Sequence, residues 1–317
     1  MIYTITLNPA LDHYVEVDRL DMDDANRVRA ESLYAGGKGI DVSRVIRRLG
    51  GNSMALGFIG GHNGRILVDL LKREGVTSYF TAIERETRRD VIISAGHPAT
   101  QTLLHARGPS VNAEEWRCFL AHLRLLDLRD AYVVVGGSLP RGIPPDAYRQ
   151  IIALVQRHGA KAILDADGPC LRAGLKAKPF AVKPNAHELE RALGRPLRTD
   201  AAILRAATVL HRGGVQIVLV SLGRRGLLVV SGRRGKGLVL RVTPPAVAVR
   251  SRVGAGDSTV AGFIFRHAGG KSLEDAVRFA TACGTAATLA PGNQLCRPAD
   301  VQRLLPRVRI EYVRGEA

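Results

Sequence analysis

The chain has 317 residues, of which 46% are hydrophobic, and 46 Lys and Arg against 29 Asp and Glu give it a formal net charge of +17. This length fits one large α/β domain or two ordinary ones, and no apolar run reaches the roughly 20 residues that a membrane-spanning helix needs. The first residues show no signal-peptide pattern and the four cysteines form no C-x-x-C pair, so we expect a cytoplasmic protein without a disulfide framework or a zinc ribbon.

The positive charge is compatible with nucleic acid, a membrane surface or an anionic metabolite as partner. However, the basic residues are spread along the chain, only eight of them are Lys, and aromatic residues amount to 5%. A basic tail, zinc-finger spacing and interleaved aromatics, which are typical of nucleic-acid binding, are all missing from the sequence. We therefore expect no membrane and no nucleic-acid partner, and we interpret the charge as a field that attracts phosphorylated metabolites.

The first half of the chain mixes strands and helices. Hydrophobic periodicity predicts strands at 2–7 and 53–60, helices at 36–50 and 63–76, short alternating strands at 13–17 and 27–34, further strands within 76–107, and a helix at 112–126 with Asn112 as its N-cap. The short alternating segments are expected to form a small accessory sheet.

A regular alternation of strand and helix follows. Strands are predicted at 131–137, 160–167, 180–185 and 215–223, helices at 144–159, 186–194, 200–214 and 273–290, and a hairpin at 226–245. Strands that alternate with helices predict an α/β fold with three layers and a central, mostly parallel sheet. We expect one domain over residues 1–317, with a small β-sheet lid whose strands lie within about 13–34 and 77–107.

The stretch "RVGAGDSTVAGF" at 252–263 places two glycines before Asp257 at the start of an apolar helix. Glycine allows positive φ and close ligand approach, and the first turn of a helix presents free N–H groups to an anion. Asp257 is then either the N-cap of this helix or a catalytic base beside an oxyanion pocket. The motif alone leaves both interpretations open.

Ligands in open α/β sheets bind beyond the carboxyl ends of the strands. Gly-rich or charged loops follow strands at that edge: Asp12, "GGKG" at 36–39, "GGSLPRG" at 136–142, "KPNAHE" at 183–188 and "SLGRRG" at 221–226. Each loop by itself is weak evidence, since a glycine cluster often marks only a turn. "GGKS" at 269–272 is not a P-loop, because Phe265 occupies the position of the required glycine.

Taken together, these motifs resemble the ribokinase-like (PfkB) carbohydrate kinases, and within them the phosphofructokinase branch. "VGAGDSTVAGF" resembles the C-terminal signature of the family and "AGGKGIDVSRVIRRLG" its N-terminal signature. "GSLPRG", "VKPNAHELE" and "VSLGRRGLLVV" match in order and spacing, and the tail "GTAATLAPGNQLCRPADV" is most similar to the minor bacterial 6-phosphofructokinases. The similarity covers nearly the whole chain.

The resemblance implies the ribokinase-like fold and ATP-dependent phosphorylation of a hexose phosphate, with Mg²⁺ and a K⁺ site. We expect fructose 6-phosphate as acceptor and fructose 1,6-bisphosphate as product; the alternatives are 1-phosphofructokinase and tagatose-6-phosphate kinase. The rival from another class is a non-catalytic protein that binds a sugar phosphate or nucleic acid. The resemblance also implies a homodimer joined through the lid strands.

The resemblance also assigns roles to residues. In the catalytic group, Asp257 would be the base, and the N–H groups of Gly254, Ala255 and Gly256 would form the anion hole. The implied sugar-phosphate ligands are Asp12, Arg27 reaching the partner subunit's site, Gly36, Gly37, Lys38, Asp41, Arg88 and Ser138. The implied nucleotide and magnesium ligands are Lys183, Asn185, Glu188, Ser221, Gly223, Gly226, Thr281 and Thr285, and the implied cation loop contains Ser251, Val253, Ala287, Ala290, Gly292 and Gln294.

Two positions depart from the family pattern, which has Asn where this chain has Asp41 and, in close relatives, Asp90. Two carboxylates near a substrate phosphate would repel it unless they bind hydroxyls or pair with Arg44, Arg88 or Arg89. Our hypothesis is that Asp41 contacts a sugar hydroxyl and not the phosphate.

Overall fold

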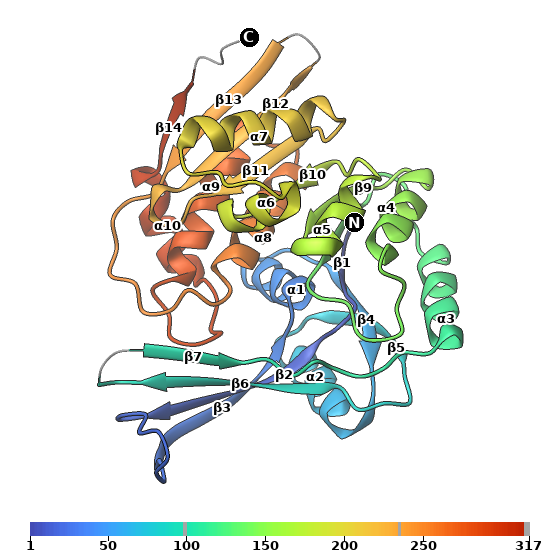
Figure 1. Cartoon of the computed structure of the whole chain (residues 1–317), viewed down its shortest axis with the longest axis vertical. Coiled ribbons are helices and arrows are strands. Elements are labelled where there is room, and N and C mark those ends of the chain that lie inside the picture. Colours follow the sequence, from blue (N-terminus) through green and yellow to red (C-terminus); the bar gives the residue numbers. More distant parts are fainter. Residues whose placement is uncertain (98–99, 234–235, 314–317) are drawn as a thin grey trace.

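A computed structural model describes residues 1–97, 100–233 and 236–313 of the chain. Within these ranges the strands form a ten-stranded sheet and a separate four-stranded sheet (Figure 1). The order of the large sheet is β14-β13-β12-β11-β10-β9-β8-β1-β4-β5, and that of the small sheet is β3-β2-β6-β7. The expected α/β class with a central sheet and a small second sheet is confirmed.

The central sheet is parallel from β5 to β11 and antiparallel from there to β14. Its strands are β1 (Ile2–Thr6), β4 (Met54–Ile59), β5 (Thr77–Ala82), β8 (Tyr132–Gly136), β9 (Lys161–Asp165), β10 (Ala181–Val182), β11 (Ile217–Ser221), β12 (Leu227–Arg233), β13 (Lys236–Thr243) and β14 (Arg309–Tyr312). Because the parallel strands share one direction, their carboxyl ends meet along one edge, where the loops with candidate site residues lie.

Helices cover both faces of this sheet (Figure 1). They are α1 (Lys38–Arg48), α2 (Gly61–Arg73), α3 (Ala113–Arg124), α4 (Ala147–Arg157), α5 (Gly168–Leu175), α6 (Ala186–Leu193), α7 (Asp200–Arg212), α8 (Ala255–Ala268), α9 (Leu273–Ala287) and α10 (Pro298–Leu304), with short 3-10 turns at Gly223–Arg225 and Leu305–Arg307. The predicted cap of α3 is confirmed, since the side chain of Asn112 accepts from the N–H groups of Glu114 and Glu115.

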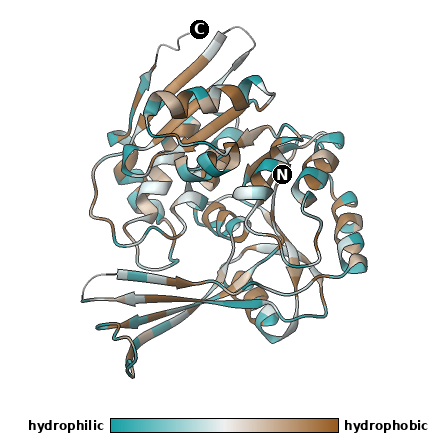
Figure 2. Cartoon of the chain, viewed as in Figure 1, coloured by the Kyte–Doolittle hydropathy of each residue, from teal (hydrophilic) through white to brown (hydrophobic). Residues whose placement is uncertain are grey.

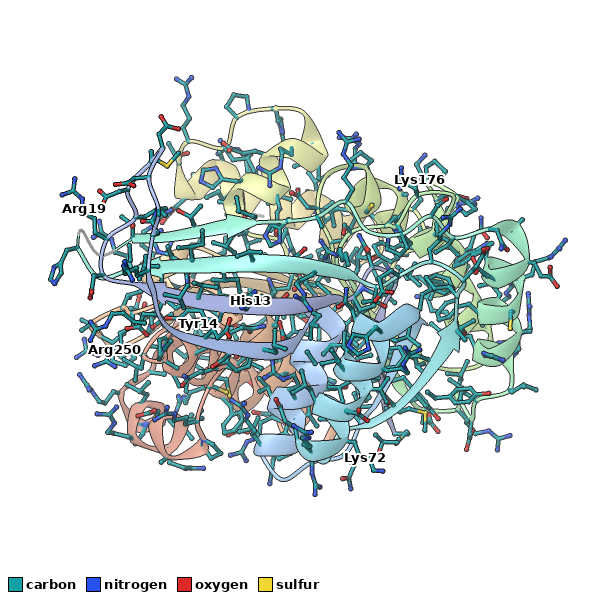
Figure 3. The ribbon with its side chains drawn as sticks, turned by 90° about the horizontal axis from the view of Figure 1, so that it is seen from below. His13, Tyr14, Arg19, Lys72, Lys176 and Arg250 are labelled. Atoms are coloured by element: carbon teal, nitrogen blue, oxygen red, sulfur yellow. The ribbon has the colours of Figure 1, made fainter. Side chains whose placement is uncertain are left out.

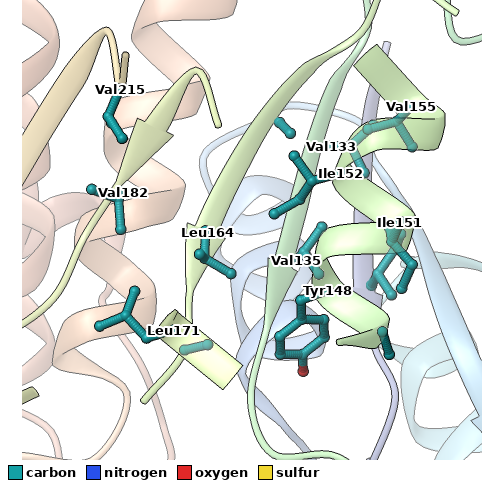
Figure 4. Close-up of a cluster of buried hydrophobic side chains, with 14 of the residues drawn as sticks. Val133, Val135, Tyr148, Ile151, Ile152, Val155, Leu164, Leu171, Val182 and Val215 are labelled. Carbon is teal, nitrogen blue, oxygen red and sulfur yellow. The ribbon is translucent and has the colours of Figure 1, made fainter. Parts of the chain in front are cut away.

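The alternation of side chains along each strand produces the three layers. Val133 and Val135 of β8 belong to one buried cluster with Tyr148 of α4 (Figure 4). Their neighbours Tyr132 and Val134 belong to a second cluster on the opposite face, which packs against α1, α8 and α9. Figure 2 shows hydrophobic colouring on strands of the central sheet, most plainly on β12 and β13. A strand that is apolar on both faces requires helices on both sides.

The small sheet consists of β2 (Ala10–Val17), β3 (Val28–Gly36), β6 (Arg88–Ala95) and β7 (Thr100–Leu104). Within 77–107, β6 and β7 belong to this sheet, whereas β5 pairs in parallel with β4 of the central sheet. β2 is continuous with the loop after β1, and its neighbouring side chains face opposite ways: Tyr14 is buried, whereas His13 is half-buried and pairs with Glu31 (Figure 3). The register of β2 with β6 places Asp12 opposite Asp90.

In the described part of the chain, no helix combines the length and apolar character that crossing a membrane would require.

Candidate active site

The N-terminus of α8 is built around Gly254, which is its N-cap with φ of 71°. A Cβ at this position would lie 2.3 Å from Leu295 Cδ2, so only glycine fits this left-handed turn. Asp257 lies in the first turn of α8, and no side chain caps the helix. The interpretation of Asp257 as the N-cap is therefore wrong, because the cap position falls three residues earlier.

The first turn of α8 leaves backbone donors free. The N–H of Ala255 makes a long hydrogen bond of 3.4 Å to the carbonyl of Arg252. The N–H groups of Gly254, Gly256 and Asp257 have no acceptor among the described residues. Free amides at a helix N-terminus bind anions, so this geometry suits the predicted anion hole. Of its three expected donors, only Ala255 already has an acceptor for its N–H among the described residues.

Asp257 carries a perturbed carboxyl group. Burial raises the pKa of Asp257 to about 8, with Asp41 and Asp165 adding to the rise and the ammonium groups of Lys38 and Lys183 opposing it. A carboxyl group with a pKa near neutrality can exchange a proton with a reacting hydroxyl at physiological pH. The position therefore has the properties of a general base.

Two lysines surround the carboxylate of Asp165 at the end of β9. Lys38 Nζ lies 2.9 Å and Lys183 Nζ 3.4 Å from Asp165 Oδ1. Burial alone would raise the pKa of Asp165, but Lys183 and Lys38 together lower it. A Cβ on Gly256 would lie 3.4 Å from Lys183 Nζ, so this ammonium group points at the first turn of α8.

Sequence analysis missed Asp165, although a signal was present. It is the last residue of a buried strand, at the sheet edge where the other candidate loops were sought. Lys38 was expected beside the phosphate of the substrate, and its ammonium group instead pairs with Asp165 and lies 3.7 Å from Glu188 Oε1. Lys38 thus belongs with the residues at the carboxyl ends of β9 and β10.

Asn185 and Glu188 form a capping box at the start of α6. The side chain of Asn185 accepts from the N–H of Glu188 at 2.9 Å, and Glu188 Oε2 accepts from the N–H of Asn185 at 2.8 Å. This local role explains their types and spacing without a ligand. Glu188 Oε1 remains directed at Lys38, and Asp165 Oδ2 is buried without a hydrogen-bond partner in the described residues.

These two carboxylate oxygens fit a hard divalent cation that is also held by nucleotide phosphates, because Mg²⁺ is commonly bound through one or two carboxylates plus substrate phosphates. No group of three or more His, Cys, Asp or Glu residues with a metal-holding arrangement occurs in the described ranges. The residues present therefore suit a metal that arrives with a nucleotide better than a metal held by protein ligands alone.

The candidate sugar residues Asp12 and Asp41 are joined by a single amide. Asn293 Nδ2 donates to Asp12 Oδ2 at 2.9 Å and lies 3.3 Å from Asp41 Oδ1. Burial raises the pKa of Asp12 to about 7, with the neighbouring Asp90 adding to the rise. Burial also raises the pKa of Asp41 to about 7, although Arg44 opposes the shift. Asn293 was not among the predicted residues, because no local pattern distinguishes it.

The glycine loop allows Asp12 to enter the site. A Cβ on Gly36 would lie 2.3 Å from Asp12 Oδ2, so a larger residue would displace the carboxylate. Gly37 is the N-cap of α1, with φ of 122°. The two glycines thus combine a close approach to Asp12 with the sharp turn into α1.

Both unusual carboxylates pair with an arginine, which is one of the two arrangements considered for them in the sequence analysis. Arg44, which is fully buried, contacts Asp41 at 3.0 Å and Glu74 at 2.8 Å. Arg88 contacts Asp90 at 3.1 Å, and His105 Nδ1 lies 2.7 Å from the same carboxylate. Both carboxylates therefore have cationic or protonatable partners before any substrate binds.

Asn8 connects two further candidate residues. Its side chain donates to Ser138 Oγ at 3.0 Å, and its carbonyl accepts from Arg88 Nη2 at 3.0 Å. Arg88 and Ser138 thus lie around the same residue at the carboxyl end of β1. Arg27, in contrast, is exposed just before β3, and no hydrogen bond or ion pair of the described residues links it to this site.

The predicted nucleotide residues follow β11 or lie on α9. Ser221 ends β11 and bridges to Asn185, while Gly223 and Gly226 bound a 3-10 turn. The hydroxyls of Thr281 and Thr285 donate to the carbonyls of the residues four positions earlier, Val277 and Thr281. This is an ordinary role for Thr in a helix, so an adenine contact of these two residues stays a prediction.

The residues of the expected cation loop come from two segments: the one that precedes α8, and the end of α9 with the turns that follow it. Ser251 Oγ donates to the carbonyl of Gly292 at 3.1 Å and accepts from the N–H of Val253 at 3.1 Å. The carbonyl of Ala287 accepts from the N–H of Ala290 at 3.3 Å, and Gln294 Oε1 accepts from Arg297 at 3.0 Å. Protein bonds therefore hold this loop together, and its cation stays a prediction.

Comparison with known proteins adds evidence of a different kind. Residues 5–300 match the model of the pfkB family carbohydrate kinases. The chain is 33% identical over 313 residues to the 1-phosphofructokinase of Borreliella burgdorferi, covering 99% of both chains. It is also 33% identical over 310 residues to the 1-phosphofructokinase of Bacillus subtilis, covering 98% of this chain and 99% of the relative.

The structure is similar to solved structures as well. Phosphofructokinase-2 from Escherichia coli in complex with potassium superimposes with a TM-score of 0.91 at 33% identity, over 96% of this chain and 98% of that one. The same enzyme in complex with fructose-6-phosphate has a TM-score of 0.89, at the same identity and coverage.

Proposed function

Because the chain belongs to the PfkB family of carbohydrate kinases, it is an ATP-dependent sugar kinase, and we propose that it phosphorylates a fructose phosphate, with fructose 1-phosphate as the preferred acceptor. The product would be fructose 1,6-bisphosphate. The curated relatives that match nearly the whole chain are named 1-phosphofructokinase, which favours the alternative raised from the sequence over the expected 6-phosphofructokinase.

Fructose 6-phosphate is the second candidate. The observation that favours it is the likeness to phosphofructokinase-2 from Escherichia coli, which was solved in complex with fructose-6-phosphate. Both acceptors give the same product, so the choice between them depends on which primary hydroxyl faces Asp257.

The observation that carries the proposal is the half-buried Asp257 in the first turn of α8, next to free backbone donors. In its ionised form Asp257 would accept the proton of the sugar hydroxyl as that oxygen attacks the γ-phosphoryl group. General-base assistance of this kind contributes roughly 10²–10⁴-fold to rate. The N–H groups of Gly254, Ala255 and Gly256 would receive the transferred phosphoryl oxygens.

Charge stabilisation would come from the ammonium groups at the same end of α8. Lys183 points toward Gly256, and Lys38 lies beside the same Asp165 carboxylate. Phosphoryl transfer depends chiefly on positioning and electrostatic stabilisation, and two ammonium groups beside free amides provide both. Ser221, Gly223 and Gly226 are proposed to line the nucleotide, with Thr281 and Thr285 toward its base.

We propose Mg²⁺ as the metal that accompanies ATP, held on the protein side by Asp165 and Glu188. When bound, it would neutralise charge on the phosphate oxygens. The unpartnered Oδ2 of Asp165 is the atom that supports this assignment. A K⁺ ion in the loop of Ser251, Val253, Ala287, Ala290, Gly292 and Gln294 is proposed on the likeness to the potassium complex.

The acceptor would lie between Asp12, Asp41 and the Gly36–Gly37 turn, with its own phosphate at Arg88 and Ser138. We further propose a homodimer through the small sheet, in which Arg27 reaches the partner's sugar site. Val28 of β3 and Leu103 and Leu104 of β7 are exposed apolar residues of that sheet, which supports an interface there. Sedimentation as a monomer at micromolar concentration would contradict this part.

The test is coupled ATP turnover with Mg²⁺ against fructose 1-phosphate, fructose 6-phosphate, tagatose 6-phosphate and unphosphorylated fructose. We expect the highest kcat/KM with fructose 1-phosphate, and a loss of about 10²–10⁴-fold in kcat for Asp257→Asn. A preference for fructose 6-phosphate would select the second candidate. No turnover with any acceptor, together with a salt-sensitive shift of DNA, would favour the rival of a binding protein.

A further inference from the structure

A hollow of about 770 Å³ is lined by Arg88, and neither Asp12 nor Asp41 of the proposed sugar site lines it. Five arginines line it, from the loop between β5 and β6, the start of β6, the segment that precedes α3 and the loop after β8: Arg85, Arg88, Arg89, Arg107 and Arg141. We call this hollow the arginine basin. Its volume lies in the range of small-molecule binding sites.

The basin has a large excess of positive charge. Its only acidic lining residue is Glu86, whose carboxylate accepts from the N–H groups of His62 and Asn63 at the start of α2. Among the described residues, no carboxylate lies within ion-pair distance of Arg85, Arg107 or Arg141. Five guanidinium groups against the carboxylates of Glu86 and of Asp90, which pairs with Arg88, leave a formal charge of +3.

Backbone bonds hold the wall of the basin in place. The N–H of Val111 donates to the carbonyl of Arg141 at 2.8 Å, and the N–H of Arg141 donates to the carbonyl of Pro109 at 3.3 Å. Asn8 Nδ2 donates to the carbonyl of Arg107 at 3.2 Å. The positions from which Arg107 and Arg141 project are therefore ordered, while their charged ends are exposed.

The phosphate of the acceptor does not account for this arrangement. Arg88 lies at the inner end, half-buried and already paired with Asp90, whereas the other four arginines are exposed. A sugar monophosphate that binds at Arg88 carries at most two negative charges, which is fewer than the formal charge of +3 in the basin. Guanidinium groups recognise phosphate oxygens through paired N–H donors.

We propose that the arginine basin is a second anion site, which binds a molecule with two or more linked phosphoryl groups beside the bound sugar phosphate. The chemistry is that of a pyrophosphate group, supplied either as an inorganic anion or as the phosphate tail of a nucleotide. Because the basin opens next to Arg88, its occupant would alter the affinity of the enzyme for the sugar phosphate.

The test is a calorimetric titration with pyrophosphate, and in a second arm with uridine diphosphate, in the presence of saturating fructose 1-phosphate. Magnesium is omitted so that the anions remain uncomplexed. We compare the wild type with R107Q/R141Q and with R205Q/R212Q, a control that removes two exposed arginines from α7. We expect pyrophosphate to bind the wild type and the control alike, and to bind R107Q/R141Q about tenfold more weakly or worse.

The two arms distinguish the sources of the phosphoryl groups. Tighter binding of uridine diphosphate that depends on Arg107 and Arg141 would identify a nucleotide tail, since a nucleotide in the ATP site would not respond to these substitutions. Equal affinity for wild type and R107Q/R141Q, no binding at all, or displacement of pyrophosphate by the sugar phosphate would overturn the proposal. The titration is repeated without sugar. Because binding of pyrophosphate requires no turnover, this arm tests the arginine basin even if fructose 1-phosphate is not the acceptor.

Discussion

Asn293 donates a hydrogen bond of 2.9 Å to Asp12, although 281 positions separate the two residues in the sequence. Both are buried, and the same amide group also lies 3.3 Å from Asp41. The loop after α9 thus contacts the two carboxylates that we propose as sugar ligands, and it also lies next to Gly254 at the N-terminus of α8.

We predict that Asn293→Ala raises the KM for the sugar phosphate about tenfold and lowers kcat less, because Asp12 and Asp41 lose the donor that orients them. An unsatisfied buried acceptor costs about 1–3 kcal/mol. Steady-state kinetics and thermal unfolding measure the two effects. The matched control is Asn112→Ala, which removes the N-cap of α3 and should reduce stability with KM unchanged. An equal rise in KM in both variants would show that Asn293 acts only through stability.

The pH–rate profile should follow Asp257. Its pKa is raised to about 8, and the base acts only when it is ionised, so kcat/KM is expected to increase with pH through this region. Rates measured from pH 6 to 9 with excess Mg²⁺ check this. A flat profile over that range would mean that proton removal by Asp257 does not limit the reaction.

Stability should change with pH in the opposite direction. The pKa of Asp257 is about 8 in the folded chain, against an ordinary aspartate value of 3.8 in the unfolded chain, so between these values the folded state binds the extra proton and stability falls as the pH rises. Asp257→Asn stays neutral and removes this dependence. We expect the free energy of unfolding of the wild type, relative to this variant, to decrease by up to about 1.4 kcal/mol per pH unit between pH 5 and 7. Denaturant unfolding at several pH values measures it, and a difference that is constant with pH would contradict the raised pKa.

Asp165→Asn is predicted to raise the Mg²⁺ concentration required for half-maximal activity about tenfold or more, because it removes the buried carboxylate whose Oδ2 has no partner within the described part of the chain. Asp167→Asn is the control two positions away, since Asp167 is partly exposed, pairs with Arg191 and caps α5. Titrations of Mg²⁺ at saturating ATP compare the variants. An unchanged Mg²⁺ requirement in Asp165→Asn would remove this residue from the metal site.

The hypothesis for Asp41 can be tested with Asp41→Asn. If the carboxylate contacts a sugar hydroxyl, the KM for the sugar phosphate should rise about tenfold, because a charge-assisted hydrogen bond is lost. The control is Asp146→Asn, a partly exposed carboxylate that pairs with the Arg three positions later, as Asp41 does. A sharp fall in KM for Asp41→Asn would instead identify Asp41 as a group that repels the substrate phosphate.

Sequence alone was sufficient for the features that depend on neighbouring residues. Most of the strands and helices, the cap at Asn112 and the apolar helix behind Asp257 follow from periodicity and local hydrogen bonding, whereas α5, α10 and β14 were not predicted. The motifs placed candidate residues at one edge of the sheet because parallel strands share a direction. The expectation of a PfkB carbohydrate kinase came from these same local patterns and agrees with the family match.

The tertiary structure decided which distant groups meet. Strand order places β5 in the central sheet. Loop packing places Asp165 between two lysines and Asn293 between two carboxylates. The same holds for the pKa of Asp257, which is set by burial and by charges from α1, β9 and the loop after β10. Burial and electrostatic fields are properties of the packed chain, and these contacts leave no periodic or local signature in the sequence from which they could be predicted.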